Sequence, residues 1–185
     1  MIENIAGTKI GILSDTHGSF PSWEKALNIF NDVDAILHAG DVLYHGPRNP
    51  IPGGYTPADL ANAIKEYKGK LYISRGNCDA SVDMMVTDRK MPHSVSLLFN
   101  GKKILLMHGD NFPLFRQLAL DNDVDLAISG HTHIASFIRE KNTIFLNPGS
   151  TTIPKGKDPA SVAIVDKDEI KIVTLEGDVL HNEKW

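Results

Sequence analysis

Seven side chains that can bind a divalent metal ion stand directly after five apolar runs of the chain. Each run is short and rich in aliphatic residues, which is typical of a buried strand. In open α/β sheets, such polar groups gather at the carboxyl ends of the strands. The side chains are those of Asp15, His17, Asp41, Asn77, His108, His131 and His133. Five coincident strand ends predict one shared metal site.

Seven ligands are too many for one ion, which offers about four to six coordination positions. They divide between two ions if the Asp41 carboxylate bridges them. One ion would then take Asp15, His17 and one of the histidines at 131 and 133, and the other would take Asn77, His108 and the remaining histidine. Spacing alone leaves open which of those histidines serves which ion. Two ions about 3.5–4 Å apart can hold the attacking and leaving oxygens of an in-line displacement at phosphorus.

The predicted ligand set also narrows the choice of metal. Imidazole, carboxylate and amide ligands without a thiolate suit Mn, Fe, Ni or Zn. Mg and Ca would require more oxygen ligands. The chemistry that we expect is therefore hydrolysis of a phosphate ester by water activated between two divalent ions.

Parallel strands must position these ligands, and the first half of the chain supplies three of them. Residues 8–14, 35–40 and 70–76 are interpreted as buried strands. Residues 22–30 and 56–67 show apolar side chains at helical spacing, which predicts two helices. The order β-α-β-α-β implies parallel strands joined by right-handed crossovers.

The pattern changes from residue 94 onward. Two alternating strands flank Asn100-Gly101, the dipeptide that most strongly indicates a hairpin. A helix is predicted over residues 112–122 and a strand over 125–130, followed by short strands at 134–139, 143–147, 160–166 and 169–175. We expect residues 1–185 to form a single α/β domain in which two mixed sheets pack between helices.

The composition is that of an ordinary soluble protein, with 42% hydrophobic and 23% charged residues. A formal net charge of −4 gives no basic footprint for long nucleic acid. The single cysteine, Cys78, cannot form an internal disulfide, which favours a reducing compartment. The N-terminus shows no signal-peptide pattern, and no apolar run is long enough for a membrane helix. We expect a cytoplasmic protein without a membrane partner.

The ordered polar groups resemble the signature of the calcineurin-like metallophosphoesterases. The resemblance extends over nearly the whole chain and is closer still to the small bacterial and archaeal YfcE-like phosphodiesterases. Three stretches resemble that subgroup in particular: GDVLYHGPRNPIPGGY, RGNCD and FLNPGSTTIPKG. The matching motifs are Asp15-x-His17, Gly40-Asp41, Gly76-Asn77, Met107-His108-Gly109 and Gly130-His131-x-His133.

This resemblance implies a four-layer sandwich of two mixed β-sheets flanked by α-helices. It implies a centre of two divalent metal ions, with Mn favoured and Zn, Ni or Fe as alternatives. His133 would join Asp15 and His17, whereas His131 would join Asn77 and His108. The implied function is that of a metal-dependent phosphodiesterase, in which an activated hydroxide attacks the phosphorus of a small phosphodiester in line.

Cys78 stands where many members of the wider family carry a histidine that is held to protonate the leaving group. We interpret the thiol as a poor substitute for that general acid, because a thiol is a weak acid and a weak hydrogen-bond donor. General acid catalysis contributes roughly 10²–10⁴-fold. Loss of this contribution favours aryl or otherwise activated diesters. A packing role, in which Cys78 fills a gap beside the site, stays equally open.

Several further residues are weaker candidates. Arg48 and Arg75 either hold a phosphate oxygen in a forked contact or stand in solvent. His45 either donates a proton or caps its loop. Tyr44 replaces the Asp or Asn that is common in the family, which leaves open any orienting hydrogen bond from this position.

The remaining polar residues of interest are assigned structural roles. Asp79 is expected to tether its own turn. His38, His93 and His181 are interpreted as core or surface residues rather than ligands. Three residues lie in a Pro/Gly-rich loop that either closes one side of the pocket or only forms turns: Asn147, Ser150 and Lys155.

Three other functions compete with the phosphodiesterase. A phosphomonoesterase would use the same ions. A non-catalytic interaction scaffold would resemble the eukaryotic protein-sorting subunit of this family, although this chain lacks none of the expected ligands. A thiol hydrolase built on Cys78 would need no metal. The loop residues Ile51, Tyr55 and Phe112 are candidates for an interface in a homo-oligomer.

Overall fold

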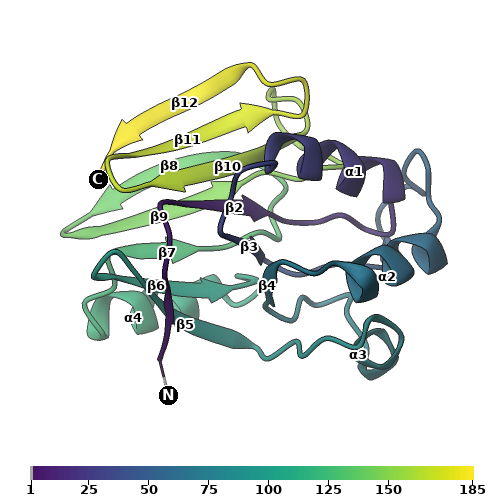
Figure 1. Cartoon of the computed structure of the whole chain (residues 1–185), viewed down its shortest axis with the longest axis horizontal. Coiled ribbons are helices and arrows are strands. Elements are labelled where there is room, and N and C mark those ends of the chain that lie inside the picture. The colour runs from purple at the N-terminus through teal and green to yellow at the C-terminus, as the bar shows by residue number, and fades with distance from the viewer. Residues whose placement is uncertain (1) are drawn as a thin grey trace.

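The computed structural model describes residues 2–185 as two six-stranded β-sheets that pack face to face (Figure 1). The first sheet has the order β1 (Glu3–Ile5), β5 (Ser94–Phe99), β6 (Lys102–Met107), β7 (Leu126–Ile128), β9 (Thr143–Pro148) and β8 (Ala135–Glu140). The second has the order β12 (Val179–Lys184), β11 (Glu169–Thr174), β10 (Ser161–Asp166), β2 (Lys9–Leu13), β3 (Ala35–His38) and β4 (Lys70–Ile73). The helices are α1 (Phe20–Ile29), α2 (Pro57–Glu66), α3 (Ser81–Thr87) and α4 (Phe112–Asp121).

Alternation of side chains along the strands builds three apolar layers. Ile10 and Ile12 of β2 point between the two sheets, where they pack with residues such as Leu106 of β6. Ile36 of β3 points to the opposite face, beneath α1 and α2. Leu105, the neighbour of Leu106, points toward α4. Burial of each such side chain contributes about 1.5–3 kcal/mol, so the alternation fixes which face of each sheet a helix covers.

Both sheets are mixed, as predicted. In the second sheet β2, β3 and β4 are parallel, whereas β10, β11 and β12 continue it antiparallel. In the first sheet β6 and β7 are parallel and β5 and β6 form the predicted hairpin. The expectation of a four-layer α/β sandwich, two mixed sheets flanked by helices, is confirmed.

Three elements were not predicted. The short strand β1 pairs with β5 at the edge of the first sheet, and the polar strand β12 pairs with β11 at the edge of the second. The helix α3 follows the RGNCDA stretch directly. The predicted strands also extend too far, because residues such as Ser14 and Ala39 already belong to the turns that follow.

Candidate metal centre

The turns after β2, β3, β4, β6 and β7 meet at one edge of the sandwich. Main-chain hydrogen bonds join them. The Asp15 N–H donates to the Gly40 carbonyl at 3.0 Å, and the Gly130 N–H donates to the His108 carbonyl at 2.9 Å. Because parallel strands end at the same edge, these turns deliver their side chains to one place. The seven expected ligands lie there as one contiguous cluster.

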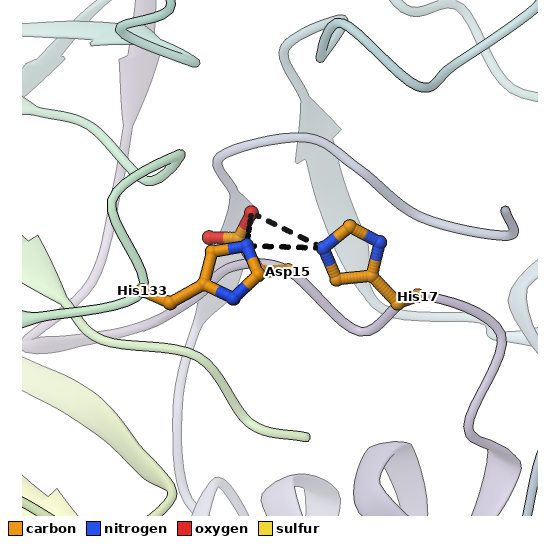
Figure 2. Close-up of side chains that lie close together, drawn as sticks. All are labelled: Asp15, His17 and His133. Atoms are coloured by element: carbon orange, nitrogen blue, oxygen red, sulfur yellow. Dashed lines mark hydrogen bonds and ion pairs between the residues drawn. The ribbon is translucent and has the colours of Figure 1, made fainter. Parts of the chain in front are cut away.

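Asp15, His17 and His133 form the deeper part of this cluster (Figure 2). Oδ1 of Asp15 lies 3.7 Å from Nε2 of His17 and 3.4 Å from Nε2 of His133, and the two Nε2 atoms are 3.2 Å apart. All three side chains are buried. Among residues 2–185, Oδ1 of Asp15 has no hydrogen-bond donor.

The hydrogen bonds of the two rings fix the side on which each ring carries its lone pair. Nδ1 of His17 donates to the Tyr44 carbonyl at 2.8 Å, and Nδ1 of His133 donates to the Ile153 carbonyl at 2.7 Å. Because a carbonyl only accepts, each neutral ring keeps its proton on Nδ1 and a lone pair on Nε2. Two lone pairs and an unpartnered carboxylate oxygen therefore converge in a buried place. A bound cation would stabilise this arrangement, so the residues fit a metal ion.

Asn77, His108 and His131 form the part of the cluster that opens toward solvent. Oδ1 of Asn77 lies 3.0 Å from Nε2 of His108 and 2.8 Å from Nδ1 of His131. Nδ1 of His108 donates to the Ala39 carbonyl at 2.7 Å. The rings of His17 and His133 donate to main-chain carbonyls in the same way. The His108 side chain is buried, His131 is half-buried and Asn77 is exposed.

Asp41 lies between the two parts. Its Oδ2 atom is 3.4 Å from Nε2 of His108 and 3.9 Å from Nε2 of His17. Its Oδ1 atom accepts a hydrogen bond from the Cys78 N–H at 2.8 Å. One carboxylate oxygen thus faces both groups of nitrogen atoms.

Burial and charge oppose each other at these side chains. Burial raises the pKa of Asp41, but the hydrogen bond and charge of His108 outweigh it and hold this pKa well below its ordinary value. Burial lowers the pKa of His108, but Asp41 and the charge of Asp15 raise it to about 9. Burial lowers the pKa of both His17 and His131. A metal ion beside Asp41 would take the place of the His108 proton, because metal binding displaces protons from its ligands.

The backbone of the cluster is strained. Left-handed backbone conformations occur at five of the seven residues: Asp15 (φ 55°), His17 (φ 43°), Asp41 (φ 58°), His131 (φ 65°) and His133 (φ 60°). Each costs about 1–2 kcal/mol relative to right-handed backbone. Strain of this kind persists where the surrounding structure holds a side chain in a functional direction.

Asp79 holds two of the turns together. Its Oδ2 atom accepts from the N–H groups of Asp41 and Gly76 at 2.9 and 2.7 Å, and its Oδ1 atom accepts from Val42 at 2.7 Å. The sequence predicted a tether within its own turn. The structure shows that Asp79 also fixes the turn that carries Asp41.

Asn147 and Ser150 brace the other turns. The Asn147 amide donates to the Gly130 carbonyl at 2.6 Å, and the Ser150 hydroxyl donates to the Asp15 carbonyl at 2.9 Å. The sequence placed both residues in a turn-rich loop without identifying these contacts. The loop reaches its partners from about 17 and 135 residues away along the chain, and sequence spacing does not reveal such contacts.

Two glycines allow this close approach. A Cβ atom at Gly76 would lie 2.2 Å from Oδ1 of Asp41, and a Cβ atom at Gly130 would lie 1.9 Å from Oγ of Ser14. Neither position tolerates a side chain without displacement of the cluster.

A polar cleft of about 350 Å³ lies over the cluster, and Asp41 and His133 are among the residues that line it. Arg48, Cys78 and Lys155 lie on its walls, as do Asn77 and His131. A larger cleft of about 430 Å³ beside α2 and α3 is mainly apolar and contains none of the seven expected ligands. The smaller cleft is therefore the one that adjoins the expected ligands.

The remaining candidates lie away from this cleft. Nε of Arg75 donates to the Asp79 carbonyl at 3.2 Å, so its guanidinium supports the turn. The His45 ring stacks edge-on between Tyr44 and Tyr55, with centroids 4.8 and 5.2 Å away, and its buried Nδ1 has no partner among residues 2–185. Tyr44 orients His17 through its main-chain carbonyl rather than its side chain.

Sγ of Cys78 lies within 4.8 Å of ligand atoms of both His17 and Asp41. The Asn77 amide donates to its sulfur at 3.3 Å, and the thiol lies near the Asp41 carboxylate. Burial and the negative charge of Asp41 raise the pKa of Cys78 to about 12. The thiol is therefore protonated in the metal-free protein and is a poor nucleophile.

The other histidines lie where the sequence placed them. His38 is buried, with Nε2 3.0 Å from the Thr16 hydroxyl and Nδ1 accepting from the Gly40 N–H at 3.1 Å. His93 and His181 are exposed.

Ile51 and Phe112 are also exposed, at 67% and 45%, and their place in an interface stays a prediction. Within residues 2–185, every helix is too short or too polar to cross a membrane.

The chain is similar to known proteins over most of its length. Residues 8–169 match the calcineurin-like phosphoesterase superfamily domain. The phosphodiesterase YfcE of Escherichia coli is 37% identical over 170 residues, which cover 90% of this chain and 92% of that protein. A probable metallophosphoesterase of Methanothermobacter thermautotrophicus is 31% identical over 94% of this chain and 90% of its own length.

Solved structures extend the similarity to the fold. A structure of the E. coli phosphoesterase YfcE superposes with a TM-score of 0.85 at 32% identity, over 95% of this chain and 98% of that one. The vacuolar protein sorting 29 structure from Cryptosporidium parvum, at 19% identity and a TM-score of 0.70 over 97% and 99%, shares the fold. The chain belongs to the calcineurin-like phosphoesterase superfamily.

Proposed function

We propose that this protein is a metal-dependent phosphodiesterase that hydrolyses small phosphodiesters at a centre of two divalent ions. The observation that carries the proposal is the buried convergence of Asp15, His17 and His133 beside Asp41. Lone pairs of these side chains face one another with no proton between the two imidazoles, which suits a cation. The similarity to a phosphodiesterase over 90% of the chain supports the same reaction class.

The proposed ligand sets follow the two parts of the cluster. One ion would be held by Asp15, His17, Asp41 and His133, and the other by Asp41, Asn77, His108 and His131. When bound, the ions would lower the pKa of water toward neutrality and neutralise charge that develops on the phosphoryl oxygens. The nitrogen-rich donor set favours Mn, with Zn, Ni or Fe as alternatives.

The protein itself positions the proposed metal ligands and limits the size of the substrate. Asp79 holds the turns of Asp41 and Gly76 in place, so the bridging carboxylate needs no rearrangement when substrate arrives. The polar cleft of about 350 Å³ admits a small substrate. The whole chain would act as a single domain, and its single cysteine suits a reducing, cytoplasmic environment.

Diester hydrolysis is proposed from the similarity to a phosphodiesterase, and Cys78 narrows the leaving groups that such a diester can carry. The thiol lies on the cleft wall, beside the open part of the cluster. It offers the leaving group only a weak hydrogen bond. Substrates whose leaving group departs without a proton are therefore favoured. A non-catalytic scaffold would not need the buried convergence of ligands or the strained backbone that holds it.

The test is hydrolysis of bis(p-nitrophenyl) phosphate and p-nitrophenyl phosphate by chelator-stripped protein, with Mn²⁺, Zn²⁺, Ni²⁺ or Mg²⁺ added back separately. We expect diester turnover to be absent without metal and restored by Mn²⁺, and to exceed monoester turnover. Folded protein that turns over neither ester with any metal would refute the enzyme and support the scaffold. Metal-independent turnover that alkylation abolishes would support a thiol hydrolase.

A further inference from the structure

We infer that the natural substrates are pyrophosphate diesters, in which two phosphates are linked through an oxygen and each carries an organic group. This inference rests on the proposed function and names its substrate class. It is carried by two cationic side chains on the cleft walls, Arg48 and Lys155.

The two walls of the cleft share one design. The loop with Tyr44 orients His17 through a carbonyl and then presents Arg48. The loop with Ile153 orients His133 through a carbonyl and then presents Lys155. Each wall thus positions one imidazole of the deeper group and brings one cationic side chain to the cleft.

Both loops are held in place close to these cations. Arg48 lies between Pro47 and Pro50, which restrict the backbone, and the Asn49 amide donates to the His45 carbonyl at 2.9 Å. The Lys155 N–H donates to the His133 carbonyl at 2.9 Å. The cations therefore stand on fixed backbone rather than on free loops.

Neither cation is neutralised by the protein. Within residues 2–185, Arg48 and Lys155 form no ion pair with a carboxylate. Asp41 is the one carboxylate on the cleft wall in that part of the chain, and the proposed ions would occupy it. In a protein of net charge −4, the cleft mouth is thus a local positive site. A simple phosphodiester carries one negative charge, which the ions address, so two further cations match a second phosphate.

The leaving group gives an independent reason for the same class. In hydrolysis of a pyrophosphate diester, the oxygen of water bonds to one phosphorus as the bond from that phosphorus to the bridging oxygen breaks. The bridging oxygen leaves with the electron pair on the second phosphate, and the two protons of water end on the two phosphomonoester products. A phosphate monoester has a second pKa of about 6, so it departs without a proton donor. An alcohol, with a pKa comparable with that of water at about 15.7, needs the strong donor that Cys78 does not supply.

The test compares three substrates on the Mn²⁺-loaded protein: UDP-glucose as a pyrophosphate diester, cyclic AMP as a diester with an alcohol leaving group, and bis(p-nitrophenyl) phosphate. We expect kcat/KM for UDP-glucose to exceed that for cyclic AMP by at least about 100-fold. Arg48→Gln and Lys155→Gln should each reduce the UDP-glucose to bis(p-nitrophenyl) phosphate ratio about 10-fold, mainly through KM. Arg48→Lys should recover part of this loss.

Lys157→Gln is the matched control, because Lys157 is exposed on the same loop and does not line the cleft. It should leave the ratio unchanged. Turnover of bis(p-nitrophenyl) phosphate without preference for UDP-glucose over cyclic AMP would overturn the substrate class and leave the phosphodiesterase intact. Equal losses on UDP-glucose and bis(p-nitrophenyl) phosphate in the Arg48 and Lys155 variants would do the same. Failure on all three substrates with every metal would overturn the proposed function itself.

Discussion

The Nε2 atoms of His17 and His133 lie 3.2 Å apart although their residues are 116 positions apart in the chain. Each ring donates its Nδ1 proton to a carbonyl of a different loop, Tyr44 on one side and Ile153 on the other. Without a cation, two lone pairs face each other beside the Asp15 carboxylate. The loops are thus arranged for a ligand that accepts electron pairs.

Asp41→Ala tests the bridging role. The substitution removes the carboxylate that faces both His17 and His108. We expect kcat on bis(p-nitrophenyl) phosphate to fall at least about 10³-fold, because loss of the shared ligand displaces both ions. Steady-state kinetics with far-ultraviolet circular dichroism would measure the effect on folded protein. His181→Ala, at an exposed position, is the control. A variant that retains a tenth of the activity would contradict a bridge at Asp41.

Cys78→His tests the general-acid position. An imidazole donates a proton near neutral pH far more readily than a thiol. We expect the rate on cyclic AMP, whose leaving group is an alkoxide, relative to bis(p-nitrophenyl) phosphate to rise about 10-fold or more. Cys78→Ser, which keeps a small polar group, should remain within a few-fold of wild type on the diester. An unchanged ratio in Cys78→His would leave Cys78 as a packing residue, and an inactive Cys78→Ser would restore the nucleophile.

Much of the fold followed from the sequence because its strands are apolar and end at glycine-containing turns. The β2, β3 and β4 strands and the hairpin at Asn100-Gly101 all form near the predicted residues. β12 was missed because the sequence VLHNEK has little apolar pattern and lies on an edge. α3 was missed because seven residues are too few for a clear helical period.

The site could be predicted only where residues able to bind a metal stand at the carboxyl ends of the strands. The cluster of seven side chains could be expected from the carboxyl ends of the strands, without knowledge of distances. The supporting contacts could not. Ser150 reaches Asp15 across 135 positions, and Arg75 turns toward Asp79 instead of the cleft. Such details depend on how the two sheets pack, which residue types alone do not encode.

Asp79→Asn tests the tether. An amide NH₂ in place of either carboxylate oxygen would face the N–H groups of Asp41, Gly76 or Val42 instead of accepting from them. We expect the free energy of unfolding to fall by about 1–3 kcal/mol. Affinity for Mn²⁺ should fall about 10–100-fold. Urea unfolding and metal titration measure these effects. Asp168→Asn, at a side chain that is 76% exposed, is the control. Unchanged metal affinity would show that the tether is not needed for the site.

His38 should make the metal-free protein sensitive to mild acid. Burial lowers its pKa from 6.5 to about 4. Above pH 6.5 the ring is neutral in both the folded and the unfolded chain. As the pH falls from 6.5 toward 4, only the unfolded chain takes up this proton, so stability is lost as the pH falls. Between pH 7 and pH 5, His38 should lower the free energy of unfolding by about 2 kcal/mol.

Urea unfolding of the metal-free wild type and of metal-free His38→Gln, each at pH 7 and at pH 5, isolates the contribution of His38 to stability. Gln keeps a hydrogen-bonding side chain toward Thr16 but does not titrate. We expect the loss of stability on acidification to be smaller in the variant by about 2 kcal/mol. Equal losses in the two proteins would show that His38 does not resist protonation.

The most direct measurement of the central claim is the number of ions that the protein binds. Chelator-stripped wild type and Asp41→Ala would be equilibrated with Mn²⁺ and freed of unbound metal by gel filtration. The metal content per chain would then be measured by inductively coupled plasma mass spectrometry. The account predicts about two Mn²⁺ per wild-type chain and fewer in the variant. One ion or none in the wild type, with Mn, Zn, Ni and Fe each tried, would contradict the two-ion centre.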